Sequence, residues 1–140
     1  MFGIKKKTGL TAALIALFVL AGGAISANAT QVTTYMDQWW SGTVGSYRTS
    51  TGVSQTIQLY GCAGGVAGSP AVTDVQMQLQ RYNGLLAPIS EGNIQQACGT
   101  TLNWGTRPSS VQYRYQLNGY VQGGPWQTGP FSADPVYINY

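Results

Sequence analysis

The sequence predicts an all-β fold, a small antiparallel β-sandwich or a small barrel of about seven to eight strands. Three observations predict this fold. Apolar and polar residues alternate in several segments, turn-forming residues separate these segments at short intervals, and no helical apolar stripe after residue 29 exceeds about two turns. One disulfide and an N-terminal signal peptide complete the expected architecture.

The first 29 residues are expected to be a signal peptide. Lys5–Lys7 form a positively charged start, residues 10–20 an apolar core, and Ala27–Ala29 a small-residue cleavage site. The apolar stretch is shorter than the roughly 20 residues that cross a bilayer. We therefore expect cleavage after Ala29 and a secreted, extracellular mature chain that does not insert into a membrane. Residues 30–140 are long enough for one core and are expected to form one domain.

Eight segments are expected to form strands. The clearest is residues 71–80, where Val75, Met77 and Leu79 alternate with glutamines, as in a strand with one buried face. Residues 111–117 repeat this alternation. Two further segments carry apolar residues on a shared face, and four shorter ones complete the set. In chain order the expected strands are 31–36, 43–48, 53–59, 71–80, 94–98, 102–104, 111–117 and 136–140.

Glycine, proline and asparagine mark the expected turns, because these residues adopt turn conformations at little cost. The expected turns are residues 61–70, 83–84, 91–93, 105–108, 118–119 and 123–125. Turns at this spacing leave room only for short strands.

Both cysteines, Cys62 and Cys98, lie in the part of the chain that export would leave intact. An exported chain meets an oxidising compartment, and two cysteines allow one pairing, so we expect a structural disulfide. A redox or metal-binding pair would need a CxxC-like spacing or further soft ligands, which the sequence lacks.

The charge of the whole chain, +3 with a pI near 9.0, does not describe residues 30–140. All lysines lie in the predicted signal peptide. The remainder is formally neutral, and its charged residues are Arg48, Arg81, Arg107, Arg114, Asp37, Asp74, Glu91 and Asp134. Four scattered arginines do not form the basic stripe that nucleic acids require, and they provide little attraction to anionic membranes. We therefore expect no nucleic-acid partner.

The composition also argues against catalysis, and we expect no cofactor and no bound metal. The chain has no His, which excludes Ser–His triads and histidine metal sites. Asp37 stands beside Trp39 and Trp40 as in a sugar-binding cleft, but an aspartate there is more simply a turn residue. A calcium site at Asp74 or Asp134 lacks the spaced acids of a calcium loop. The sequence thus predicts a protein that is not an enzyme.

Three tryptophans are candidate ligand-binding residues. Trp39 and Trp40 are adjacent, and adjacent strand positions point to opposite faces, so one indole is hard to bury with the other. Trp126 lies in a turn-rich segment, where its ring can plug the sandwich end or stand out as a platform. The area gained by burial favours the plug.

The outward face of the two clearest strands is the second candidate surface. Its residues are Gln76, Gln78, Gln80, Gln112, Arg114 and Gln116. Each glutamine amide donates and accepts hydrogen bonds, so such a face can bind sugar hydroxyls. Two alternatives are a solvent face whose amides bond only to water and a self-associating surface, since uncharged Gln-rich strands can stack edge to edge.

These observations favour a secreted, non-catalytic protein that binds a neutral extracellular glycan or cell-envelope polymer through aromatic and glutamine side chains. A second hypothesis is an antibacterial protein or enzyme inhibitor that contacts another secreted or surface protein. Its contact loop would be residues 61–70 or 84–93, held by the disulfide. A third hypothesis is an extracellular structural protein that self-assembles.

Overall fold

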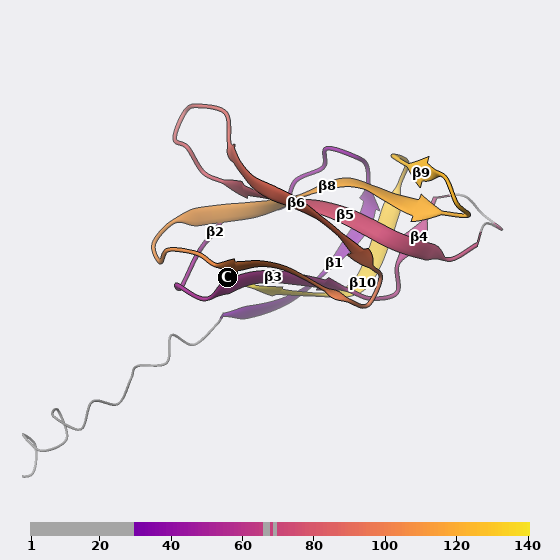
Figure 1. The fold of residues 1–140 in the computed structure, drawn as a ribbon, viewed down its shortest axis with the longest axis horizontal. Coiled ribbons are helices and arrows are strands. Elements are labelled where there is room, and N and C mark those ends of the chain that lie inside the picture. The colour runs from indigo at the N-terminus through magenta and orange to yellow at the C-terminus, as the bar shows by residue number, and fades with distance from the viewer. Residues whose placement is uncertain (1–29, 66–67, 69) are drawn as a thin grey trace, which may run out of the picture.

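The computed structural model describes residues 30–65, 68 and 70–140. These residues form two antiparallel sheets stacked as a sandwich (Figure 1), and none of them is helical, so no described helix could cross a bilayer. The predicted β-sandwich is therefore confirmed. The predicted signal peptide, residues 1–29, and three residues of the predicted loop 61–70 lie outside the described part of the chain.

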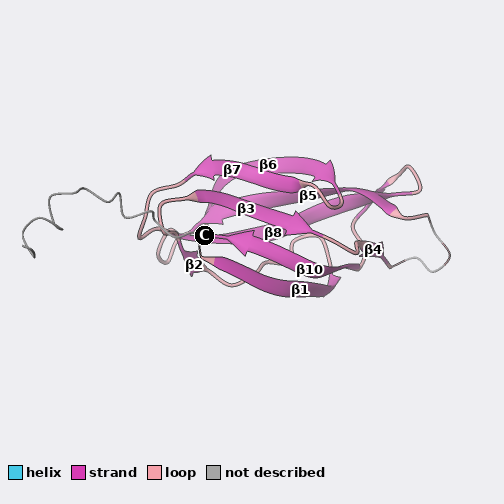
Figure 2. Cartoon of the chain, turned by 90° about the horizontal axis from the view of Figure 1, so that it is seen from below, coloured by secondary structure: helices cyan, strands magenta, loops and turns pink. Residues whose placement is uncertain are grey.

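The first sheet, sheet A, joins the beginning of the described chain to its end. Its strand order is β1-β10-β3-β7, and Figure 2 shows these strands side by side. A two-residue strand, β4, pairs with β10 beside β3. The bounds are β1 Gln31–Trp39, β3 Ser54–Leu59, β4 Ala63–Gly64, β7 Thr101–Thr106 and β10 Phe131–Asn139.

The second sheet, sheet B, has the strand order β2-β8-β5-β6, and the short β9 also pairs with β8. Its two central strands are the ones with the clearest alternation in the sequence. The bounds are β2 Arg48–Thr49, β5 Val72–Arg81, β6 Ile89–Ala97, β8 Gln112–Gln122 and β9 Trp126–Gln127. Because β6 follows β5 directly in a hairpin, the two strands share a long antiparallel register.

The core lies between the two sheets and follows the predicted alternation. Ile57 and Leu59 of β3 face Met77, Leu79 and Leu117 of sheet B, and all five side chains are almost completely buried. The intervening residues of β5 and β8 point away from the core. The period-two pattern therefore identified the buried face of these strands correctly.

Two predicted turns lie inside strands. Residues 91–93 belong to β6 and residues 118–119 to β8, and each lies near a shift in strand register. Glycine at these places serves a β-bulge rather than a turn. Residues 43–48 are also not a continuous strand, since only an isolated bridge at Val44 and the short β2 pair there with β8.

The predicted disulfide between Cys62 and Cys98 is present. Cys62 follows β3 in sheet A and Cys98 follows β6 in sheet B, so the bond ties the two sheets at one end of the sandwich. A disulfide indicates an oxidising, extracellular type of environment. The disulfide does not hold the second predicted contact loop, residues 84–93. Gly84 lies at the end of the β5–β6 hairpin that is far from Cys98, and the residues from Ile89 onward already belong to strand β6.

Candidate functional site

The outward side of sheet B carries a continuous group of polar side chains, here called the amide face. Strand register brings them together: Gln78 pairs with Gln116 on one side and with Asn93 on the other, and Gln80 pairs with Arg114. All are at least partly accessible except Gln80, which is nearly buried among its neighbours. The amide face consists of Gln76, Gln78, Gln80, Asn93, Arg114, Gln116 and Asn118.

Gln80 is the centre of a hydrogen-bond network on this face. Its Nε2 donates to Gln78 Oε1 at 2.7 Å and also to Gln116 Oε1, and its Oε1 accepts from Arg114 Nε at 2.9 Å. Gln78 Nε2 in turn donates to Ser90 Oγ at 3.0 Å. The orientation of the Gln80 amide is thereby fixed, because its oxygen faces a cation and its nitrogen faces two acceptors.

The network continues toward the other end of the face. Gln116 Nε2 donates to Asn118 Oδ1 at 3.5 Å, and Asn118 Nδ2 donates to Asn93 Oδ1 at 3.1 Å. Each amide has two donor hydrogens and an oxygen with two lone pairs. The bonds above therefore leave donors on Gln116 and Asn118 and acceptor capacity on Asn93 for a ligand.

An aromatic pair flanks the Arg114 end of the face. The Arg114 guanidinium carbon lies 4.6 Å from the centre of the Tyr47 ring, a cation–π contact. The Tyr82 ring meets Tyr47 edge-on with 5.1 Å between centroids. Tyr82 remains exposed beside this contact.

Exposed indoles flank the other end. Trp126 lies against the backbone of Gly119, next to Asn118, and retains 42% of its surface exposure. Trp40 is 57% exposed and precedes Ser41, whose hydroxyl donates to the Asn118 carbonyl oxygen at 2.6 Å. The amide face thus lies between two groups of aromatic side chains, one beside Arg114 and the other beside Gly119. These two residues of β8 are five positions apart, or about 16 Å along the strand.

The predicted tryptophans have different environments. Trp39 is partly buried against the core while Trp40 is exposed, so the expectation that the two adjacent indoles are not buried together is confirmed. The preference for Trp126 as a plug was wrong. Gly119 leaves space on the outer surface of sheet B, and the indole occupies that space instead of the interior.

Gln76 and Gln112 contribute less than the sequence suggested. Both point outward from sheet B, but within the described residues neither side chain takes part in the hydrogen-bond network. Gln112 lies beyond Arg114 at the strand end, paired with Thr49. The alternation predicted the direction of these side chains correctly. It did not reveal Tyr47, Asn93 and Asn118 as members of the site, because all three lie outside the two segments of clear alternation, residues 71–80 and 111–117.

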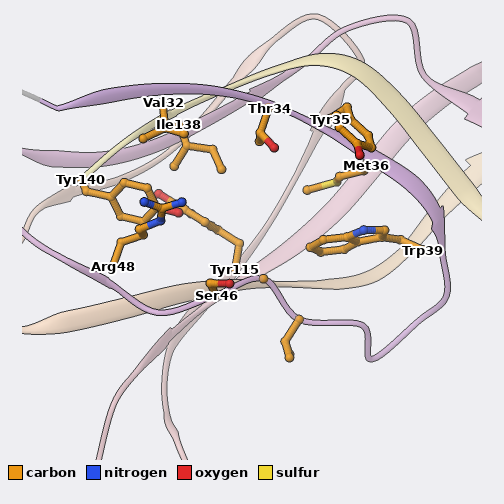
Figure 3. A pocket seen from close by; sticks show the side chains of 12 residues that line it. Val32, Thr34, Tyr35, Met36, Trp39, Ser46, Arg48, Tyr115, Ile138 and Tyr140 are labelled. Atoms are coloured by element: carbon orange, nitrogen blue, oxygen red, sulfur yellow. The ribbon is translucent and has the colours of Figure 1, made fainter.

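Trp39 lines a pocket of about 280 Å³ beside β1 (Figure 3). Met36, Ile138 and Tyr140 form much of its apolar wall, and Arg48 lies at its margin. The pocket has no hydrogen-bonded polar cluster comparable to the amide face. Its residues come from distant parts of the chain, so a periodic sequence pattern does not reveal it.

Burial raises the pKa of two tyrosine hydroxyls that line this pocket, those of Tyr115 and Tyr140. The pKa of Tyr140 is about 12, because desolvation outweighs the opposing charge of Arg48. Burial also raises the pKa of Tyr115, whose hydroxyl donates to the Thr56 carbonyl oxygen at 3.1 Å. Both groups are therefore neutral hydrogen-bond donors at physiological pH.

The described carboxylates form no cluster of three potential metal ligands with one another or with cysteine. Asp37 accepts a hydrogen bond from the Ser132 hydroxyl and lines a shallow hollow with Asp134. Glu91 pairs with Arg81 at 2.8 Å and with Arg107 at 3.7 Å. The chemistry that the amide face offers is neutral hydrogen bonding between stacking surfaces.

Comparison of the chain with protein-family models, with curated proteins and with solved structures gave no match.

Proposed function

We propose that this protein is secreted and binds a neutral glycan or cell-envelope polymer on the amide face, without catalysing a reaction. The observation that carries the proposal is the fixed network around Gln80, with exposed aromatic rings at both ends of the face. Sugar rings present apolar faces that stack on aromatic side chains and hydroxyls that bond to amides.

The network favours binding because it orients the amides before a ligand arrives. A free glutamine loses side-chain entropy when it is immobilised, at a cost of about 0.5–1.5 kcal/mol. Gln80 and Gln116 already hold each other in place, so a ligand encounters a largely ordered surface. The formal neutrality of residues 30–140 is consistent with an uncharged ligand.

The first experiment measures sedimentation of the mature, disulfide-bonded protein with isolated envelope polysaccharides and its tryptophan emission on addition of soluble glycans. We expect Trp126→Ala to weaken binding at least about tenfold, as truncation of an aromatic contact residue can. Gln116→Ala should also weaken it. The matched control is Gln31→Ala, an exposed glutamine of β1 in the other sheet.

Equal binding by Trp126→Ala, Gln116→Ala and the control would exclude the amide face as the binding surface. Absence of binding to every polysaccharide in a broad panel would remove the proposed function itself.

A second candidate function, self-assembly, is supported by strand β6. This strand pairs only with β5 among the described strands, and most of its residues are exposed. Its one charged residue, Glu91, is engaged by arginines, so little repulsion opposes edge-to-edge pairing. A monomer at high concentration in sedimentation velocity would exclude this candidate.

A further inference from the structure

The loop between β5 and β6 presents an apolar tip, formed by Tyr82, Leu85, Leu86 and Ile89. Leu85 is fully exposed, Leu86 is 72% exposed, and the other two are also exposed. Figure 1 shows this loop projecting beyond the strands that carry it. Isolated exposed leucines are ordinary, but adjacent ones at a projecting tip are typical of an interaction surface.

The loop has a defined turn rather than an extended backbone. Leu86 N donates to the Asn83 carbonyl oxygen at 3.1 Å, and Asn83 Nδ2 donates to the Ala87 carbonyl oxygen at 3.4 Å. Gly84, with a φ of +62°, permits the chain reversal. The turn therefore holds both leucines outward as a convex group.

Arginines gather at the base of this tip. Arg81 precedes Tyr82 and is paired with Tyr113, and Arg48 pairs with Tyr113 from the other side. The two arginine backbones are therefore about 10 Å apart, across two strand spacings. Arg114 is one residue farther along the same register.

Arg107 completes the group, since it shares the Glu91 carboxylate with Arg81. The expectation of scattered arginines is therefore wrong: all four lie at one end of the sandwich. The sequence did not show this because the four residues come from four separate segments.

The aspartates lie at the opposite end. Asp74 is seven residues from Arg81 along β5, or about 23 Å. Asp134 N donates to the Tyr60 carbonyl oxygen, close to the disulfide end. Asp37 accepts from Ser132, which is paired with Ala63 at that same end. Four arginines and one glutamate thus give the tip end a side-chain charge of +3, although residues 30–140 are neutral as a whole.

We propose that the apolar tip docks on an anionic lipid surface, with Leu85 and Leu86 entering the interface and the exposed Arg48 at its base facing lipid phosphates. The other three arginines are held by Glu91, Gln80 and Tyr47 and contribute to the positive charge of this end. Apolar side chains with adjacent basic residues bind membranes peripherally in this way. The contact is interfacial and involves no membrane span. The convex shape and the charge at the base favour a lipid surface over an apolar pocket of another protein, which would require no basic surround.

The test uses the mature, disulfide-bonded protein and vesicles of phosphatidylcholine with or without phosphatidylglycerol. We expect cosedimentation with the anionic vesicles, reduced by salt. The Leu85→Ser/Leu86→Ser double variant should bind at least about tenfold more weakly, because two exposed apolar side chains are removed. Arg48→Gln should weaken binding and flatten its salt dependence.

The matched control is Tyr35→Ser, which removes a 68% exposed aromatic side chain of β1 that lies outside the tip. It should bind anionic vesicles like the wild type. The leucine variant is expected to fold normally, since both side chains are exposed, and its urea midpoint checks this. Failure of the wild type to bind anionic vesicles, or equal binding by the leucine variant, would overturn the proposal, as would a leucine-dependent protein partner without vesicle binding. The vesicle assay and the polysaccharide assay test the two proposals separately, because the variants used with vesicles lie outside the amide face.

Discussion

Trp126 packs directly on the backbone of Gly119. A Cβ atom added to this glycine would lie 2.6 Å from Trp126 Cε2 and 2.7 Å from the Gln127 carbonyl oxygen. Contacts of this length cannot be accommodated without movement of β9. The absence of a side chain at position 119 is therefore what allows the indole to lie beside the amide face.

We predict that Gly119→Ala displaces Trp126 and destabilises the protein by about 1–3 kcal/mol, the usual cost of overpacking. Urea unfolding measures the loss, and a red shift of tryptophan emission reports the displaced ring. The control is Gly129→Ala, whose added methyl group would meet only the Tyr120 hydroxyl at 3.7 Å. An equal effect of the two substitutions would show that chain stiffening, not the contact with Trp126, is responsible.

The two misplaced turns show the limit of local signals. Asn118-Gly119 and Glu91-Gly92-Asn93 resemble turns because each contains a glycine beside an asparagine. In the fold, Gly119 makes room for Trp126, and Gly92, with a φ of +113°, lies within the bulged strand β6. Both structural roles depend on residues that are close in space but lie outside the local segment, and the sequence around each glycine does not identify these residues.

The same distinction applies to the candidate site. Alternation alone placed Gln78, Gln80 and Gln116 on one face, because side-chain direction in a strand follows from local backbone geometry. The bond from Gln80 to Gln116 depends on the register of β5 against β8, which periodicity does not determine. The sequence therefore predicts which side of each strand carries the glutamines, but not which glutamines form hydrogen bonds with one another.

Trp104 provides a second bridge between the sheets. Its Nε1 donates to the Gly92 carbonyl oxygen at 2.9 Å, joining β7 of sheet A to β6 of sheet B, and its ring packs 5.3 Å from that of Tyr115. We predict that Trp104→Phe lowers the free energy of unfolding by about 2–3 kcal/mol, from one lost hydrogen bond and incomplete filling of the core.

The measurement is urea unfolding followed by circular dichroism, because the substitution removes part of the fluorescence. The control is Trp40→Phe, at an exposed indole, which should change stability by less than about 0.5 kcal/mol. If the two variants were equally stable, the Trp104–Gly92 bond would not contribute to holding the sheets together.

The disulfide should stabilise the protein by restricting the unfolded chain. Cys62 and Cys98 are 36 residues apart, and closing a loop of this length contributes about 3–4 kcal/mol in the chain-entropy treatment. We predict this loss for the Cys62→Ser/Cys98→Ser variant in urea unfolding. Dithiothreitol should destabilise the wild type similarly and leave the variant unchanged. Equal stability of the oxidised wild type and the variant would contradict the prediction.

Alkaline pH should destabilise the fold through Tyr115 and Tyr140. Burial raises the pKa of both hydroxyls above the ordinary value of 10.0, to about 12 for Tyr140. Above pH 10 the unfolded chain therefore loses protons that the folded chain retains, so the contribution of these two groups to stability is constant below this pH and falls as pH rises. Each group contributes a slope of about 1.4 kcal/mol per pH unit, which for Tyr140 ends near pH 12.

Urea unfolding at a series of pH values from 8 to 11.5 tests this prediction, with comparison of slopes rather than absolute stabilities. Tyr140→Phe removes one titrating group and should roughly halve the alkaline slope due to this pair. Tyr115→Phe should do the same, although loss of its bond to the Thr56 carbonyl also lowers stability at neutral pH by about 1 kcal/mol. If the slope remained at its wild-type value in both variants, the alkaline transition would originate elsewhere, since a phenylalanine at either position has no proton to lose.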